Sequence, residues 1–306
     1  MQSILYALLP IFLLIALGYF FKRIAFPDDS FWAHADKFTY YVLFPSLLVY
    51  KLSTANLDGV DGFAFVSTAL ITIVIISVLL VVLNYFAFLF NGPSFTSVYQ
   101  GATRFNTYVF LALVDALYGD GGLVLAAFLI TFLIPTLNVC CITVFAFYTN
   151  SEKVNFQAVA LSIVKNPLIL ACLFGGGLNY FALSLGESIE TTLSILSSAA
   201  LPLGLLSVGV GLHLNHLKEA KMELFVALFF KLAIFPMVIF FAARSFGIEG
   251  LPLMILVIFG AMPTASSAYI LARQLGGDMK LMSSVITLQT LLSIVTISVI
   301  LQVITP

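Results

Sequence analysis

The sequence predicts an all-α polytopic membrane protein with ten transmembrane helices, built as two inverted five-helix repeats with crossing broken helices four and nine. Three observations carry this prediction: an apolar composition, long uncharged segments, and residues that recur at one offset. Of the 306 residues, 61% are hydrophobic and 9% are charged. Soluble globular chains average about 45–50% apolar and about 25% charged residues. The composition therefore excludes a soluble globular protein.

Ten segments are apolar and long enough to cross the hydrocarbon core as helices, which takes about 20 residues each. Four uncharged runs meet this length most clearly: 3–21, 62–83, 191–212 and 250–272. The other six contain one or two charged residues or several polar ones. The predicted helices cover residues 3–21, 33–51, 62–90, 97–118, 121–148, 157–181, 191–212, 222–245, 250–274 and 279–303.

Basic residues indicate how these helices are oriented. Eight Lys and Arg residues lie in or beside the odd-numbered connections, whereas only Lys51 and Arg244 lie on the other side. Because cytoplasmic loops carry the excess of Lys and Arg, the odd connections are predicted to be cytoplasmic. Both termini are then outside, and the protein is expected in the cell (inner, cytoplasmic) membrane. Lys22 and Arg23 follow the first apolar run, which is the reverse of the order in a cleaved signal peptide.

Residues recur between the two halves at an offset of 157, since 167 − 10 = 157. The identical pairs are Pro10 and Pro167, Pro45 and Pro202, and Gly119 and Gly276. Five helices per unit place the second unit upside down relative to the first, which is the plan of many secondary transporters. Residues 1–150 are predicted to form the first repeat and residues 151–306 the second. The alternative is chance, because proline and glycine are common in membrane helices.

The fourth and ninth predicted helices both contain small and polar residues near mid-span, within Gln100–Tyr108 and Phe259–Tyr269. Pro263 removes a backbone donor and interrupts its helix. Asn106 occupies the equivalent position in the first repeat, since 263 − 106 = 157. Interrupted backbone at membrane depth persists only where protein or a water-filled cavity satisfies it. We therefore expect two broken helices that cross near the midplane; an ordinary proline kink is the alternative.

Such a crossing creates an anion site, because helix N-termini carry partial positive charge and free N–H groups. Arg104 and Lys231 add buried cations, which are functional candidates by default. The alternatives are that Arg104 reaches the inner surface and that Lys231 pairs with Asp115. Asn138 and Gln289 could line the site or form interhelical hydrogen bonds. The predicted substrate-binding residues are Arg104, Asn106, Thr107, Pro263, Thr264, Ser266, Ser267, Asn138, Gln289 and Lys231.

The sequence gives no sign of a cofactor, a metal site, a catalytic centre or a nucleic-acid partner. Its three cysteines lie in apolar segments and have no metal-ligand spacing. Asp120 and Asp278 fall in loops on opposite sides of the membrane, so they cannot form a catalytic pair. Proton coupling usually requires an acidic residue or histidine near the membrane midplane. Asp115 is the one acid that comes near this depth, and its position is closer to the outer interface. Coupling to Na⁺, coupling to H⁺ and uniport all stay open.

Several segments together resemble the auxin efflux carrier family, which includes bacterial malate-permease-like proteins. The matching stretches are 100–108, 165–168, 201–209, and 261–267 continuing to 276–278. The resemblance implies a scaffold of helices one, two, six and seven, and a mobile transport domain of helices three to five and eight to ten. It implies an elevator mechanism, organic anion substrates and dimers through the scaffold. Asn106 replaces the proline of plant members at the first crossover.

The function predicted from these features is a secondary transporter of a small organic anion, such as a carboxylate or an auxin-like acid. Its partners are then the substrate, membrane lipid and a second copy of the chain. The alternatives are an anion channel and a membrane sensor without transport, because broken helices can also line a pore or bind a ligand. Neither substrate identity nor the direction of transport follows from the sequence.

Overall fold

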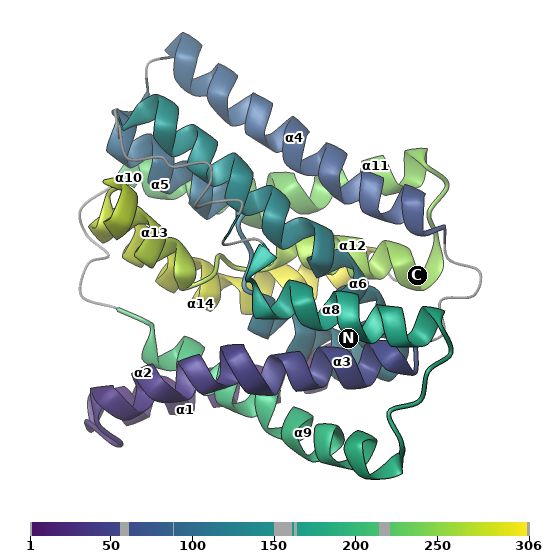
Figure 1. Ribbon diagram of the computed structural model, residues 1–306. Coiled ribbons are helices and arrows are strands. Elements are labelled where there is room, and N and C mark those ends of the chain that lie inside the picture. The colour runs from purple at the N-terminus through teal and green to yellow at the C-terminus, as the bar shows by residue number, and fades with distance from the viewer. Residues whose placement is uncertain are drawn as a thin grey trace.

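The computed structural model describes residues 2–55, 61–87, 89–149, 161, 164–213 and 221–304, and within these ranges it consists of helices and their connections, without strands (Figure 1). Long apolar segments dictate this outcome, because a helix satisfies its own backbone hydrogen bonds. The helices are α1 (Gln2–Arg23), α2 (Asp29–Phe38), α3 (Phe44–Ser53), α4 (Gly62–Ala87), α5 (Gly92–Thr103), α6 (Thr107–Tyr148), α8 (Pro167–Tyr180), α9 (Glu187–Val210), α10 (Lys221–Phe229), α11 (Phe235–Ser245), α12 (Gly250–Ala261), α13 (Ser267–Leu275) and α14 (Met279–Ile304), with π-helical turns η1 (Thr39–Leu43) and η3 (Phe230–Ile234).

Helices occupy all ten predicted segments, and the described residues include six stretches long and apolar enough to cross a membrane. Several predicted spans consist of more than one helix: the second is α2, η1 and α3, and the eighth is α10, η3 and α11. The predicted start of the sixth span, at residue 157, lies outside the described residues. The multi-pass character is confirmed, whereas the ten crossings and the inverted repeat stay predictions.

Both π-helical turns lie directly before a Phe-Pro pair. Pro45 is the second residue of α3, and Pro236 is the second residue of α11. Proline donates no backbone hydrogen bond, and its ring clashes with the carbonyl four residues earlier. Those carbonyls, of Tyr41 and Leu232, lie inside η1 and η3. A widened turn accommodates the clash, so each span continues through its proline without ending.

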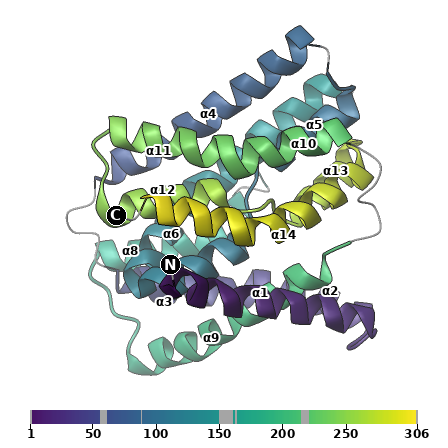
Figure 2. The same ribbon diagram turned by 180° about the vertical axis from the view of Figure 1, so that it is seen from behind.

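The helix ends gather on two faces, as the predicted topology requires. At one face Lys51, in the last turn of α3, forms an ion pair with Asp120, beside the kink in α6 at Gly119. Asn179 of α8 also donates to the carbonyls of Ser53 and Ala55 at this face. The start of α1 and the end of α14 lie toward the same face (Figures 1 and 2).

The other set of helix ends lies at the opposite face, where hydrogen bonds connect them. The Asp278 N–H, before α14, donates to the carbonyl of Pro93 at the start of α5. The Lys22 ammonium, near the end of α1, donates to the carbonyl of Val210 at the end of α9. Between these two ends, Asp28 caps α2 by accepting from the Phe31 N–H at 2.8 Å. This bond holds the pKa of the Asp28 carboxyl below its usual range.

Helices α1 and α9 pack at backbone contact distance because each presents a glycine to the other. A Cβ atom at Gly209 would lie 1.9 Å from the carbonyl oxygen of Ile15, and one at Gly18 would lie 2.1 Å from that of Leu206. Apolar burial between helices gains little in lipid, so close packing of small residues supplies the attraction.

Candidate functional site: the crossing of two broken helices

The first break separates α5 from α6. Helix α5 ends at Thr103, and Arg104 turns to an extended conformation with φ −71° and ψ 159°. Asn106 then caps α6: its Oδ1 accepts hydrogen bonds from the N–H groups of Tyr108 at 3.0 Å and Val109 at 3.2 Å. Asparagine is a preferred N-cap residue, so the sequence can end one helix and start another here without a proline.

The second break separates α12 from α13, and it contacts the first. Helix α12 ends at Ala261, Met262 is extended, and α13 begins at Ser267. The Asn106 N–H donates to the carbonyl of Pro263 at 2.7 Å. The backbone nitrogen of Pro263 cannot donate a hydrogen bond to Asn106 in return, because proline has no N–H group. The two predicted breaks are therefore present and in direct contact.

Gln289 and Thr264 satisfy the hydrogen-bonding groups of the backbone at this crossing. The Thr264 N–H donates to Gln289 Oε1 at 2.9 Å, and the Thr264 hydroxyl donates to the Gly101 carbonyl at 2.7 Å. Gln289 Nε2 donates to the carbonyls of Gly101 at 2.8 Å and Ala227 at 3.1 Å. A helix end leaves carbonyls without intrahelical partners, and Gly101 belongs to the last turn of α5. Both polar side chains are fully buried and serve the backbone here.

Arg104 lies in the first break and connects it to α6 and α13. Its guanidinium donates to Asn138 Oδ1 of α6 at 3.2 Å and to Ser267 Oγ of α13 at 3.3 Å. The described residues include no ion pair to Arg104. A guanidinium has five N–H donors, so donors stay available for an anion. The interpretation of Asn138 as purely interhelical is incomplete, because it also positions this cation.

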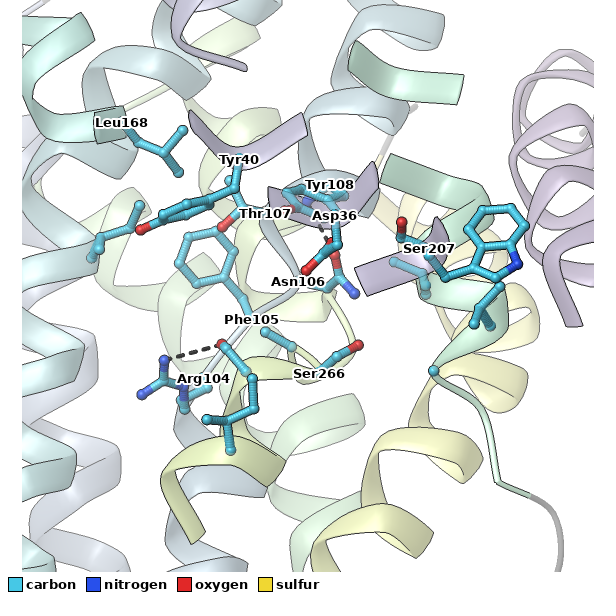
Figure 3. Close-up of a pocket in the computed structure, with 18 of the residues that line it drawn as sticks. Asp36, Tyr40, Arg104, Phe105, Asn106, Thr107, Tyr108, Leu168, Ser207 and Ser266 are labelled. Carbon is cyan, nitrogen blue, oxygen red and sulfur yellow. Dashed lines mark hydrogen bonds between the residues drawn. The ribbon is translucent and has the colours of Figure 1, made fainter. Parts of the chain in front are cut away.

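A cavity of about 590 Å³ lies against the crossing, within the size range of small-molecule sites (Figure 3). It adjoins the starts of α6 and α13. Among the described hydrogen bonds, none uses the N–H of Thr107, Ser266 or Ser267. Those groups give the cavity the positive edge expected of helix N-termini. Six predicted residues line it: Arg104, Asn106, Thr107, Asn138, Ser266 and Ser267.

The other four predicted residues do not line this cavity. Pro263, Thr264 and Gln289 are buried within the crossing itself. Lys231, in η3, is fully buried, and its ammonium lies 4.3 Å from the ring centre of Phe235. Within the described part of the chain the ammonium has no hydrogen-bond acceptor and no ion pair, so the alternative that Lys231 pairs with Asp115 is not supported.

The cavity also contains polar residues that the sequence reasoning missed. Asp36 and Tyr40 contribute from α2 and η1, Ser207 from α9, and Lys22 from the end of α1. Asp29, Asp36 and Tyr40 are spaced by seven and four residues, which places them on one helix face. That spacing was a usable signal.

Comparison with known proteins identifies the family. A model of the family described as membrane transport protein matches residues 3–301. The chain belongs to this family. The family is that of the auxin efflux carriers, so the resemblance seen in the sequence is confirmed. Membership indicates a transporter and not an enzyme.

Two relatives in the membrane transport protein family cover almost the whole chain. One is a protein of Rhizobium meliloti (strain 1021) named "Putative malonate transporter", which is 25% identical across 99% of this chain and 97% of its own length. The other, an "Uncharacterized transporter" of Methanothermobacter thermautotrophicus, is 24% identical across 94% of each chain. Both names agree with transport as the general activity.

Proposed function

We propose that this protein is a secondary transporter that carries a small organic anion, a short-chain carboxylate, through the crossing of α5–α6 and α12–α13. The observation that carries the proposal is the cavity where two helix N-termini and the Arg104 guanidinium meet. Each of these groups favours a negative ligand. The name of the Rhizobium relative supports a short carboxylic acid as the substrate class.

The arrangement of the cavity supports alternating access. Its lining reaches from the crossing to Lys22 and Asp29, at the face predicted to be cytoplasmic. Among the described residues that line it, none comes from the opposite face around Lys51 and Asp120. Toward that face, Phe44 stacks on Tyr108 with ring centres 4.5 Å apart. We interpret this arrangement as the inward-open state of a carrier.

Packing supports a division into a scaffold and a transport domain. Helix α1 packs against α9, and α3 packs against α8 and α9, whereas α5 packs against α6, α10 and α14. In the proposed elevator, α1 to α3, α8 and α9 stay fixed while the helices that form the crossing move. Dimerisation through the scaffold and the choice between Na⁺ coupling, H⁺ coupling and uniport stay predictions.

The test is uptake of labelled malonate and other short carboxylates into proteoliposomes. Arg104→Ala is expected to weaken substrate affinity by about ten- to a hundredfold, since hydrogen bonds to a charged group contribute about 1.5–3 kcal/mol. Arg273→Ala is the matched control: Arg273 is exposed on α13 and does not line the cavity. Normal uptake by folded Arg104→Ala would reject the proposed site. Flux that does not saturate with substrate would favour a channel, and binding without flux would favour a sensor.

A further inference from the structure

The cavity is lined by two carboxylates, Asp29 and Asp36, as well as by two cations, Lys22 and Arg104. Asp36 lies on the α2 wall, and Arg104 lies on the crossing, where it bonds to Asn138 and Ser267. In Figure 3 Asp36, Asn106, Arg104 and Ser266 surround the same open space. Neither charge is neutralised by an ion pair within the described residues. The site is therefore dipolar, and not uniformly positive.

Asp36 has spare capacity to accept hydrogen bonds. Its side chain is exposed, and the Tyr108 hydroxyl donates a hydrogen bond to its carboxylate. An ionised carboxylate has about four acceptor positions and no donor. A ligand group beside it gains by donating a hydrogen bond, whereas a second ligand carboxylate is repelled by its like charge.

We propose that Asp36 is a specificity-determining residue: it selects acids whose end opposite the bound carboxylate donates a hydrogen bond, such as hydroxy acids, over fully ionised dicarboxylates. The ligand carboxylate binds Arg104 and the N-termini of α6 and α13, and the far end donates to Asp36. This inference rests on the proposed transport function and narrows its substrate class. Other titratable groups near Asp36 are Tyr108, Tyr40, Lys22 and Asp29.

The test compares straight-chain acids of three to six carbons that differ only at the far end, which is a methyl, a hydroxyl or a second carboxylate. The three-carbon set is propanoate, 3-hydroxypropanoate and malonate; the six-carbon set is hexanoate, 6-hydroxyhexanoate and adipate. Affinities for the purified full-length protein are measured at pH 7.5, where both carboxyls of the diacids are ionised. At the best chain length, the wild type is expected to bind the hydroxy acid about tenfold or more tightly than the other two.

Asp36→Asn removes the charge at nearly constant shape, so it is expected to abolish the preference and to strengthen dicarboxylate binding. Glu187→Gln is the matched control: Glu187 is an exposed carboxylate at the start of α9 that does not line the cavity, so its loss should leave the ranking unchanged. The wild-type ranking is informative even if Asp36→Asn fails to fold.

The outcomes separate the two proposals. Wild-type protein that binds dicarboxylates as tightly as hydroxy acids overturns the role of Asp36, as does an unchanged ranking in folded Asp36→Asn. If binding still requires Arg104 in those cases, the transport proposal stands. If no acid in the panel binds, or if binding ignores Arg104→Ala, the proposed function and the Asp36 inference both fail.

Discussion

Gln289→Leu tests whether the crossing is held by the hydrogen bonds that one side chain makes to three backbone groups. The substitution removes the acceptor of the Thr264 N–H and the donor to the Ala227 carbonyl. Gly101 keeps one donor, the Thr264 hydroxyl at 2.7 Å. An unsatisfied buried backbone group costs about 1–3 kcal/mol, and a lost hydrogen bond with a remaining partner costs about 0.5–1.5 kcal/mol. The lower bounds of these costs sum to about 2.5 kcal/mol, which is the smallest destabilisation expected.

Thermal unfolding in detergent, followed with a thiol-reactive dye, measures this effect directly. Cys141 and Cys172 are buried free thiols in α6 and α8, so the dye reacts as the bundle opens. Gln302→Leu is the matched control, because Gln302 is an exposed glutamine of the same helix, α14. Its unfolding midpoint should stay near that of the wild type.

Average values for membrane proteins predict a smaller destabilisation. Hydrogen bonds between membrane helices average about 0.6 kcal/mol, because the separated helices find other partners. Gln289 differs, since its partners are backbone groups near a helix break. A Gln289→Leu midpoint that matches Gln302→Leu would refute the reasoning and would reassign the crossing's stability to apolar packing alone.

Two further substitutions address buried charge and close packing. Lys231→Met is expected to raise the unfolding midpoint, because it removes a buried ammonium without hydrogen bonds and keeps a long side chain beside Phe235; a lower midpoint would indicate an essential structural role for the charge. Gly209→Ala is expected to destabilise by about 1–3 kcal/mol, because its methyl group would meet the Ile15 carbonyl. Gly176→Ala, which has open space around it, is the control and should be neutral or stabilising.

The sequence predicted well those features that depend on local chemistry. Long apolar runs specify helices, and Pro263 specifies a break, because both effects need only the neighbouring backbone. The first break has no proline. It was nevertheless predicted, from the position of Asn106 opposite Pro263, and the Asn106 side chain makes the N-cap that a helix start needs.

The sequence could not predict which way each polar side chain faces. In a soluble helix the apolar face points to the core, but helices that are apolar on every side give no such direction. Gln289 and Lys231 therefore appeared equivalent to Asn138 as candidates, although only Asn138 lines the cavity. Asp36 was missed for the converse reason: its approach to the crossing depends on how α2 packs against α9 and on its bond to Tyr108 of α6, a long-range arrangement.

The one-way hydrogen bond between the two breaks makes the two helix starts chemically unequal. Two N–H groups of helix α6 donate to the Asn106 side chain, whereas no side-chain cap is present on α13. Among the described hydrogen bonds, the N–H groups of Ser266 and Ser267 are unused at the start of α13, whereas only that of Thr107 is unused at the start of α6. An anion at the crossing therefore meets more unused donors at α13. An anion bound there would lie closer to Ser266 and Ser267 than to Thr107.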